Sequence, residues 1–165
     1  MQKKHYDEIA KMMRERERIA QGVVLLNRAL TVIGYIAFPL LIVMQVCVGE
    51  WQVALKTAIV CGIGFCAVAV LRCVINAPRP YEVLGIKPLV KKGTLGKSFP
   101  SRHAFCMFMI AFAWCVWNMR VGAVLVVLSC VMGVVRVVLG VHWPRDILGA
   151  IVCAGVFGVA LVLVV

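Results

Sequence analysis

Three residues that could carry out phosphoryl chemistry lie between two long apolar runs: Arg136, His142 and Asp146. Apolar segments avoid such groups because desolvating them is costly, so their presence indicates a functional site. Pro144 suits the first position of a helix, which places Asp146 in the first turn and His142 just before it. A carboxylate there can accept one imidazole N–H and leave the second nitrogen as nucleophile or base, while an arginine fork suits phosphate oxygens. A purely structural His–Asp pair is the alternative.

The composition places this site in an integral membrane protein of one domain, residues 1–165. Of its 165 residues 63% are hydrophobic, and the mean hydropathy is +0.98, whereas soluble domains are roughly half apolar. The net charge of +11 suits anionic headgroups or a phosphorylated substrate, and ordinary anchoring at the membrane surface explains part of it. No soluble basic domain exists to hold nucleic acid, so we expect no nucleic-acid partner. The eight cysteines lack metal-ligand spacing and are interpreted as apolar packing residues.

The apolar runs predict the elements that position these residues. Five membrane spans are expected at about 24–48, 52–75, 103–117, 121–140 and 146–165, each near the roughly 20 residues that a bilayer requires. Residues 1–20 mix both charge signs around an apolar face, which predicts an amphipathic helix on the membrane surface or on the bundle. Pro78 and Pro80 end the second span, residues 81–99 form one long loop, and Ser101 is a natural N-cap for the third span. The predicted fold class is an all-α integral membrane bundle.

Counting the spans brings further polar residues to one membrane face. The second span ends there, the third begins there, the fourth ends there and the fifth begins there. Two helices start at this face, so their N-terminal N–H groups and dipoles can contribute to an anion site. The residues that can converge are Arg72, Arg79, Ser101, Arg102, His103, Arg136, His142 and Asp146.

These residues form three clusters that together resemble the signature of the type 2 phosphatidic acid phosphatase (PAP2) superfamily. That signature is Lys, six residues, Arg-Pro; then Pro-Ser-Gly-His; then Ser-Arg, five residues, His, three residues, Asp. The matching residues, at the same spacings, are Arg72 with Arg79-Pro80, then Pro100-Ser101-Arg102-His103, then Arg136 with His142 and Asp146. The resemblance covers about residues 52–165 and implies the helical bundle that these phosphatases share with vanadate haloperoxidases.

The resemblance also implies a role for each matched residue. His142 would be the nucleophile that takes the phosphoryl group as a phosphohistidine, Asp146 would orient it, and His103 would protonate the leaving oxygen. The phosphate oxygens would be held by Arg72, Arg79, Ser101 and Arg136. Arginine forks can neutralise a phosphate without a metal, and no carboxylate cluster suits magnesium. We therefore expect metal-independent chemistry without a cofactor.

Three positions depart from the family pattern. Arg72 replaces Lys and keeps the charge, Val135 replaces Ser and loses a hydroxyl, and Arg102 replaces Gly. Arg102 removes the small residue that would let the backbone approach the phosphate closely. One hypothesis is that its guanidinium reaches a second phosphate, as in a pyrophosphate (diphosphate) ester. A side chain that merely extends to the membrane surface is the alternative.

We predict a lipid phosphatase of a bacterial cell membrane. The favoured substrate is polyprenyl (undecaprenyl) diphosphate, followed by phosphatidic acid or phosphatidylglycerophosphate. A lipid phosphotransferase would use the same residues. A non-enzymatic anion-binding or transport protein would not need two histidines and Asp146, and a short membrane-embedded chain argues against a haloperoxidase. The positive-inside rule places the site in the cytoplasm with the basic amino terminus, whereas bacterial members resembling this chain generally place it outside, so the membrane face stays open, as does the oligomeric state.

Overall fold

A computed structural model describes residues 8, 12, 16–85, 88–90 and 95–165 of the chain. These residues fold into helices and the segments that join them. In chain order the helices are α2 (Glu17–Cys47), α3 (Trp51–Ile75), α4 (Pro80–Leu84), α5 (Arg102–Trp117), α6 (Met119–Val138) and α7 (Pro144–Val164). Most of the amphipathic helix predicted over residues 1–20 lies outside the described residues.

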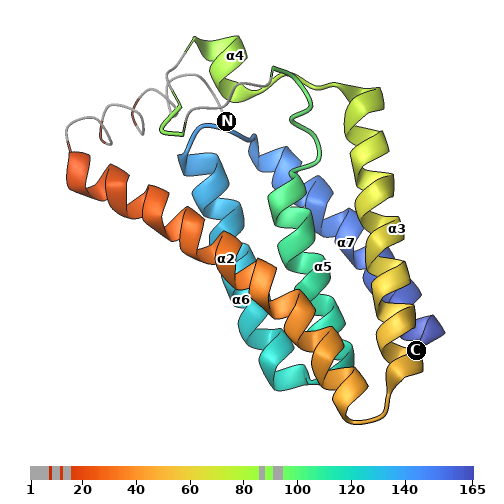
Figure 1. The fold of residues 1–165 in the computed structure, drawn as a ribbon. Coiled ribbons are helices and arrows are strands. Elements are labelled where there is room, and N and C mark those ends of the chain that lie inside the picture. Colours follow the sequence, from red (N-terminus) through yellow and green to blue (C-terminus); the bar gives the residue numbers. More distant parts are fainter. Residues whose placement is uncertain (1–7, 9–11, 13–15, 86–87, 91–94) are drawn as a thin grey trace.

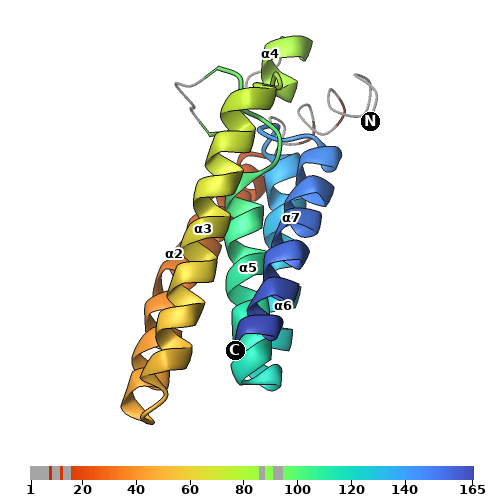
Figure 2. The same ribbon diagram turned by 90° about the vertical axis from the view of Figure 1, so that its right-hand side faces the viewer.

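The long helices form two groups (Figures 1 and 2). α2 and α3 make an antiparallel hairpin, which lies against a group formed by α5, α6 and α7. α5 is the central helix, since it contacts α2, α3, α6 and α7. α4 lies at the end of the bundle opposite the α2–α3 turn (Figure 1).

Four of the five predicted spans have the length and composition to cross a membrane: α2, the segment Trp51–Leu84 that contains α3, α6 and α7. The protein is therefore a multi-pass membrane protein. The remaining predicted span, α5, is apolar but has 16 residues, which at 1.5 Å per residue covers roughly 24 Å of a hydrocarbon core of roughly 30 Å. Its neighbours surround it, so its backbone and ends need not reach the lipid boundary.

Two predicted boundaries are wrong. α2 begins at Glu17, seven residues before the expected start of the first span, because polar residues continue the helix beyond the apolar run. The segment expected to be one long loop begins with α4, whose first residue is Pro80. Proline suits this position, because the N–H that it lacks would have no partner in the first turn.

α5 carries much of the core because it is apolar around its whole circumference. Its buried residues include Phe105, Phe108 and Trp114, and the Trp114 indole N–H donates to the Ala37 carbonyl at 2.9 Å. Glycine lets α6 approach α5 closely, since a Cβ on Gly122 would lie 2.4 Å from the Cys115 backbone nitrogen. The close packing gives the residues at the helix ends a rigid support.

Fewer of the eight cysteines pack in the core than predicted. All eight are free thiols, and Cys61 is buried in the main hydrophobic core. Four others are exposed on the outer surface of the helices: Cys47, Cys66, Cys73 and Cys130. Exposure of an apolar thiol is tolerated on a helix that faces lipid.

The helix ends that were predicted to converge lie at one end of the bundle (Figure 1). α3 ends at Ile75, where Asn76 adopts a left-handed backbone conformation with φ of 43°. Pro144 begins α7, as predicted. The ends of α3 and α6 and the starts of α5 and α7 therefore bring segments far apart in sequence together.

Candidate active site

His142 and Asp146 form a buried pair at the start of α7. His142 Nδ1 lies 3.3 Å from Asp146 Oδ2, and the two side chains are 1% and 0% exposed. The backbone N–H of Trp143 donates to the same carboxylate oxygen at 2.9 Å, which fixes the carboxylate at the helix start. A proton on Nδ1 would be donated to Asp146, and Nε2 would then be the basic nitrogen of the ring.

Ser98 is a third member of this group, and the sequence analysis missed it. Its hydroxyl donates to Asp146 Oδ2, and its backbone N–H donates to the Ala77 carbonyl at 2.8 Å. The residue is fully buried. Its place three residues before Ser101 was a weak signal, because a serine in a glycine-rich loop usually serves the turn itself.

Arg79 connects three segments and is 2% exposed. Its Nε donates to the Gly96 carbonyl at 3.0 Å, and its two terminal nitrogens donate to the carbonyls of Val141 at 3.1 Å and Lys97 at 3.4 Å. These bonds use three of the five guanidinium N–H donors. Arg79 therefore holds the residue before His142 against the loop that leads to α5.

Arg72 supports the start of α5 from the last turn of α3. One terminal nitrogen donates to the carbonyls of Ser98, at 3.4 Å, and Pro100. The Phe99–Pro100 peptide bond between these acceptors is cis. Arg72 thus contacts the second sequence cluster from the first.

Ser101 occupies the N-cap position of α5, as predicted, but its side chain makes no capping hydrogen bond. Its backbone N–H donates instead to the Asp146 carbonyl at 3.0 Å, which joins the start of α5 to the first turn of α7. Its hydroxyl is buried and has no hydrogen-bond partner within the described part of the chain. A ligand oxygen could take that place.

Arg136 lies in the last turn of α6 and is 3% exposed. One terminal nitrogen donates to Asn27 Oδ1 of α2 at 3.2 Å. Its Nε and other terminal nitrogen are buried without a hydrogen-bond partner among the described residues. A buried guanidinium with two unpaired nitrogens is costly unless an anion completes it. Asn27 was also missed, because a lone amide near the entrance of an apolar run carries no specific signal.

The arginines interact electrostatically with one another. The charge of Arg136 repels those of Arg72 and Arg79, and these two also repel each other and attract Asp146. Such a concentration of positive charge favours an anion. We refer to the following residues as the polar cluster: Arg72, Arg79, Ser98, Ser101, Arg136, His142 and Asp146.

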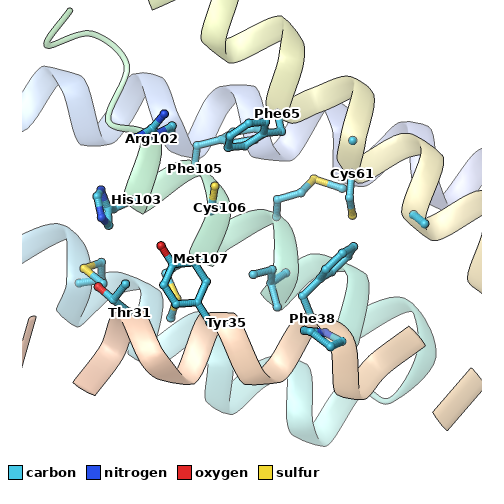
Figure 3. A pocket seen from close by; sticks show the side chains of 17 residues that line it. Thr31, Tyr35, Phe38, Cys61, Phe65, Arg102, His103, Phe105, Cys106 and Met107 are labelled. Carbon is cyan, nitrogen blue, oxygen red and sulfur yellow. The ribbon is translucent and has the colours of Figure 1, made fainter. Parts of the chain in front are cut away.

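The other two predicted residues, Arg102 and His103, lie at one end of a cavity of about 600 Å³ between α2, α3 and α5 (Figure 3). The walls are apolar and include Tyr35, Phe38 and Phe65. We call this space the apolar cavity. The Arg102 guanidinium carbon lies 5.9 Å from the centre of the Phe65 ring. The start of α5 thus contributes its N-cap residue, Ser101, to the polar cluster and its first two residues, Arg102 and His103, to the cavity.

The described residues contain no group of three or more His, Cys, Asp or Glu side chains that could hold a metal ion. Chemistry without a metal stays a prediction to be tested directly.

A family model decides the relationship that the three motifs suggested. Residues 53–165 match the model described as the PAP2 superfamily. The chain belongs to this superfamily. The match includes all eight residues predicted for the site and leaves the whole of α2, with Asn27, outside it.

Two curated bacterial proteins resemble parts of this PAP2 chain. "Putative undecaprenyl-diphosphatase YbjG" of Escherichia coli (strain K12) is 45% identical over 62 residues, which are 37% of this chain and 31% of the relative. "Undecaprenyl-diphosphatase BcrC" of Bacillus subtilis (strain 168) is 32% identical over 81 residues, or 49% of this chain and 42% of the relative. The chain thus spans less than half the length of either relative.

Two solved structures share the fold. The crystal structure of Aquifex aeolicus LpxE has a TM-score of 0.66 and 23% identity, over 83% of this chain and 85% of that one. A PAP2 type phosphatidylglycerolphosphate phosphatase from Bacillus subtilis has a TM-score of 0.63 and 23% identity, over 95% and 90%. These likenesses establish the PAP2 transmembrane fold.

Proposed function

We propose that this PAP2 protein is a metal-independent phosphatase that hydrolyses a phosphate or diphosphate ester of a membrane lipid through a phosphohistidine. The observation that carries the proposal is the buried His142–Asp146–Ser98 group, together with Arg136, which has two buried nitrogens without a hydrogen-bond partner among the described residues. A nucleophile, its orienting carboxylate and a cationic phosphate site are the parts that phosphoryl transfer needs.

In the first step, His142 Nε2 attacks the phosphorus as the bond to the leaving oxygen breaks. The electron pair of that bond goes to the leaving oxygen, which takes a proton from His103. Asp146 accepts the Nδ1–H of His142 and stabilises the positive ring. Arg72, Arg79, Arg136 and Ser101 compensate the charge on the other phosphate oxygens.

In the second step, His103 is neutral and accepts a proton from water as the water attacks the phosphohistidine. The N–P bond breaks, its electron pair returns to His142, and inorganic phosphate leaves. One histidine is therefore nucleophile and the other is acid and then base. The contacts of Arg72 and Arg79 to backbone carbonyls support a second role for these two residues, which is to hold the site in shape.

Polyprenyl diphosphate, and undecaprenyl diphosphate in particular, is the substrate that we favour. The names of YbjG and BcrC, which resemble parts of this chain, support this choice. The apolar cavity that ends at His103 offers room for a hydrocarbon chain. Phosphatidic acid and phosphatidylglycerophosphate are the competing substrates.

The test is phosphate release by the purified full chain in detergent with EDTA. The three lipids are compared at equal concentration with wild type, His142→Ala and, as a matched control, Cys130→Ala, which changes an exposed side chain of α6. We expect release that survives EDTA, depends on His142 and is unaffected in Cys130→Ala. Acid-labile labelling of the wild type by a radioactive lipid phosphate would trap the phosphohistidine.

Two results would contradict the proposal. Undiminished release by folded His142→Ala would remove the nucleophile from the mechanism. Transfer of the phosphoryl group to another lipid without free phosphate would identify a phosphotransferase that uses the same residues.

A further inference from the structure

Arg102 differs from the other site arginines in its surroundings. Arg79 and Arg136 are buried and Arg72 donates to two backbone carbonyls, whereas Arg102 is exposed and lines the apolar cavity. Its guanidinium lies over Phe65 of α3, and such a contact orients the planar group without using its N–H donors. Arg102 is therefore an oriented cation that is available to a ligand.

Arg102 lies next to His103, the residue proposed to protonate the leaving oxygen of the substrate. It directly precedes His103, and both residues lie at the same end of the cavity (Figure 3). The cavity continues along α5 to Ile110, eight residues away, or roughly 12 Å at 1.5 Å per residue. A lipid with its hydrocarbon chain in this cavity presents its headgroup to His103 and places the chain side of the headgroup beside Arg102.

Lipid monophosphates and lipid diphosphates differ on the chain side of the headgroup, where Arg102 lies. When His142 attacks a lipid monophosphate, the leaving group is an alcohol. When it attacks the terminal phosphorus of a lipid diphosphate, the bond to the bridging oxygen breaks, that oxygen takes the electron pair and the His103 proton, and the leaving group is a lipid monophosphate. The inner phosphate of a diphosphate carries negative charge on the chain side of the leaving oxygen.

We propose that Arg102 binds this inner phosphate and makes the protein select lipid diphosphates over lipid monophosphates. The inference rests on the proposed function. A guanidinium binds phosphate oxygens through charge-assisted hydrogen bonds. The charges of Arg72 and Arg79 also reach Arg102, so the positive field extends from the polar cluster to the mouth of the cavity. Arg102 thereby distinguishes substrates by their leaving group and not by their hydrocarbon chain.

The test compares kcat/KM for farnesyl diphosphate and farnesyl monophosphate, which share one chain. The variants are Arg102→Gln, Arg102→Lys and, as matched control, Arg120→Gln, which removes an exposed arginine in the first turn of α6, at the end of this helix far from Arg136. We expect Arg102→Gln to lower the diphosphate-to-monophosphate ratio of kcat/KM by about ten-fold or more, the loss of a charge-assisted contact. Arg102→Lys keeps part of the preference, and Arg120→Gln keeps the wild-type ratio.

An unchanged ratio in Arg102→Gln, whether both activities fall together or neither falls, would overturn the inference. Hydrolysis of both lipids by the wild type with equal kcat/KM would overturn it as well. A folded wild type that hydrolyses neither lipid would instead overturn the proposed function, so the two failures are distinguishable.

Discussion

The polar cluster and the apolar cavity meet at the start of α5, and they hold their polar side chains in different ways. In the polar cluster, Arg79 and Ser98 are buried and hydrogen-bonded to other protein groups. In the cavity, Arg102 is exposed and contacts an aromatic ring. The fixed hydrogen-bonding groups of the polar cluster suit the phosphoryl group that reacts. The exposed end of the cavity suits a lipid that must enter and leave. The following predictions test this contrast from the largest expected effect to the smallest.

Asp146→Asn should have the largest effect, because it disrupts the orientation of His142 inside the rigid polar cluster. The amide can present an N–H to Nδ1 and favour the wrong ring tautomer, so we expect kcat to fall by about a thousand-fold. The measurement is phosphate release at saturating lipid, with circular dichroism to confirm the fold. A fall of less than ten-fold would show that the pair is structural.

Arg79→Lys should lower both stability and activity, because lysine cannot reproduce the three bonds to the carbonyls of Gly96, Lys97 and Val141. We expect a lower melting temperature in detergent and about a hundred-fold lower kcat/KM. Arg120→Lys is the control, since Arg120 is exposed and lies in the first turn of α6. A normal melting temperature with lost activity would restrict Arg79 to phosphate binding.

Asn27→Leu tests a contact between the two helix groups. Loss of the bond to Arg136 leaves three nitrogens of this guanidinium to be oriented by substrate alone, so we expect about ten-fold lower kcat/KM. Asn27→Gln should recover part of the loss, which a merely structural defect would not do. Equal kcat/KM in Asn27→Leu and wild type would show that α2 has no influence on the phosphate site.

Gly62→Leu tests the cavity alone. Gly62 lines the cavity, and an added Cβ would meet nothing within 4 Å, so the leucine fills space without straining the bundle. We expect a several-fold higher KM for long-chain lipid and little change for a short-chain analogue. Gly155→Leu on α7 is the matched control, because its Cβ would also meet nothing within 4 Å. Equal effects of both substitutions would mean that the chain does not occupy this cavity.

Much of this site was predictable because its signals are local. The spacing of His142 and Asp146, with Pro144 between them, places the pair in one turn at a helix start, and the structure confirms the contact. Apolar runs and prolines located the second, fourth and fifth spans to within two residues, because hydropathy and lost backbone donors act on short stretches. The family resemblance, based on the three motifs, was also confirmed.

The sequence by itself thus determined the membrane class, the order of the spans and the convergence of their ends. Only the tertiary structure decided that α5 is a short enclosed helix, that Ser98 bonds Asp146 and that Asn27 bonds Arg136, 109 positions away. It also decided that Arg102 faces the cavity while the adjacent Ser101 joins the polar cluster. The reason is physical: periodicity and composition report on neighbours along the chain, whereas burial and hydrogen bonds between distant segments depend on how the helices pack.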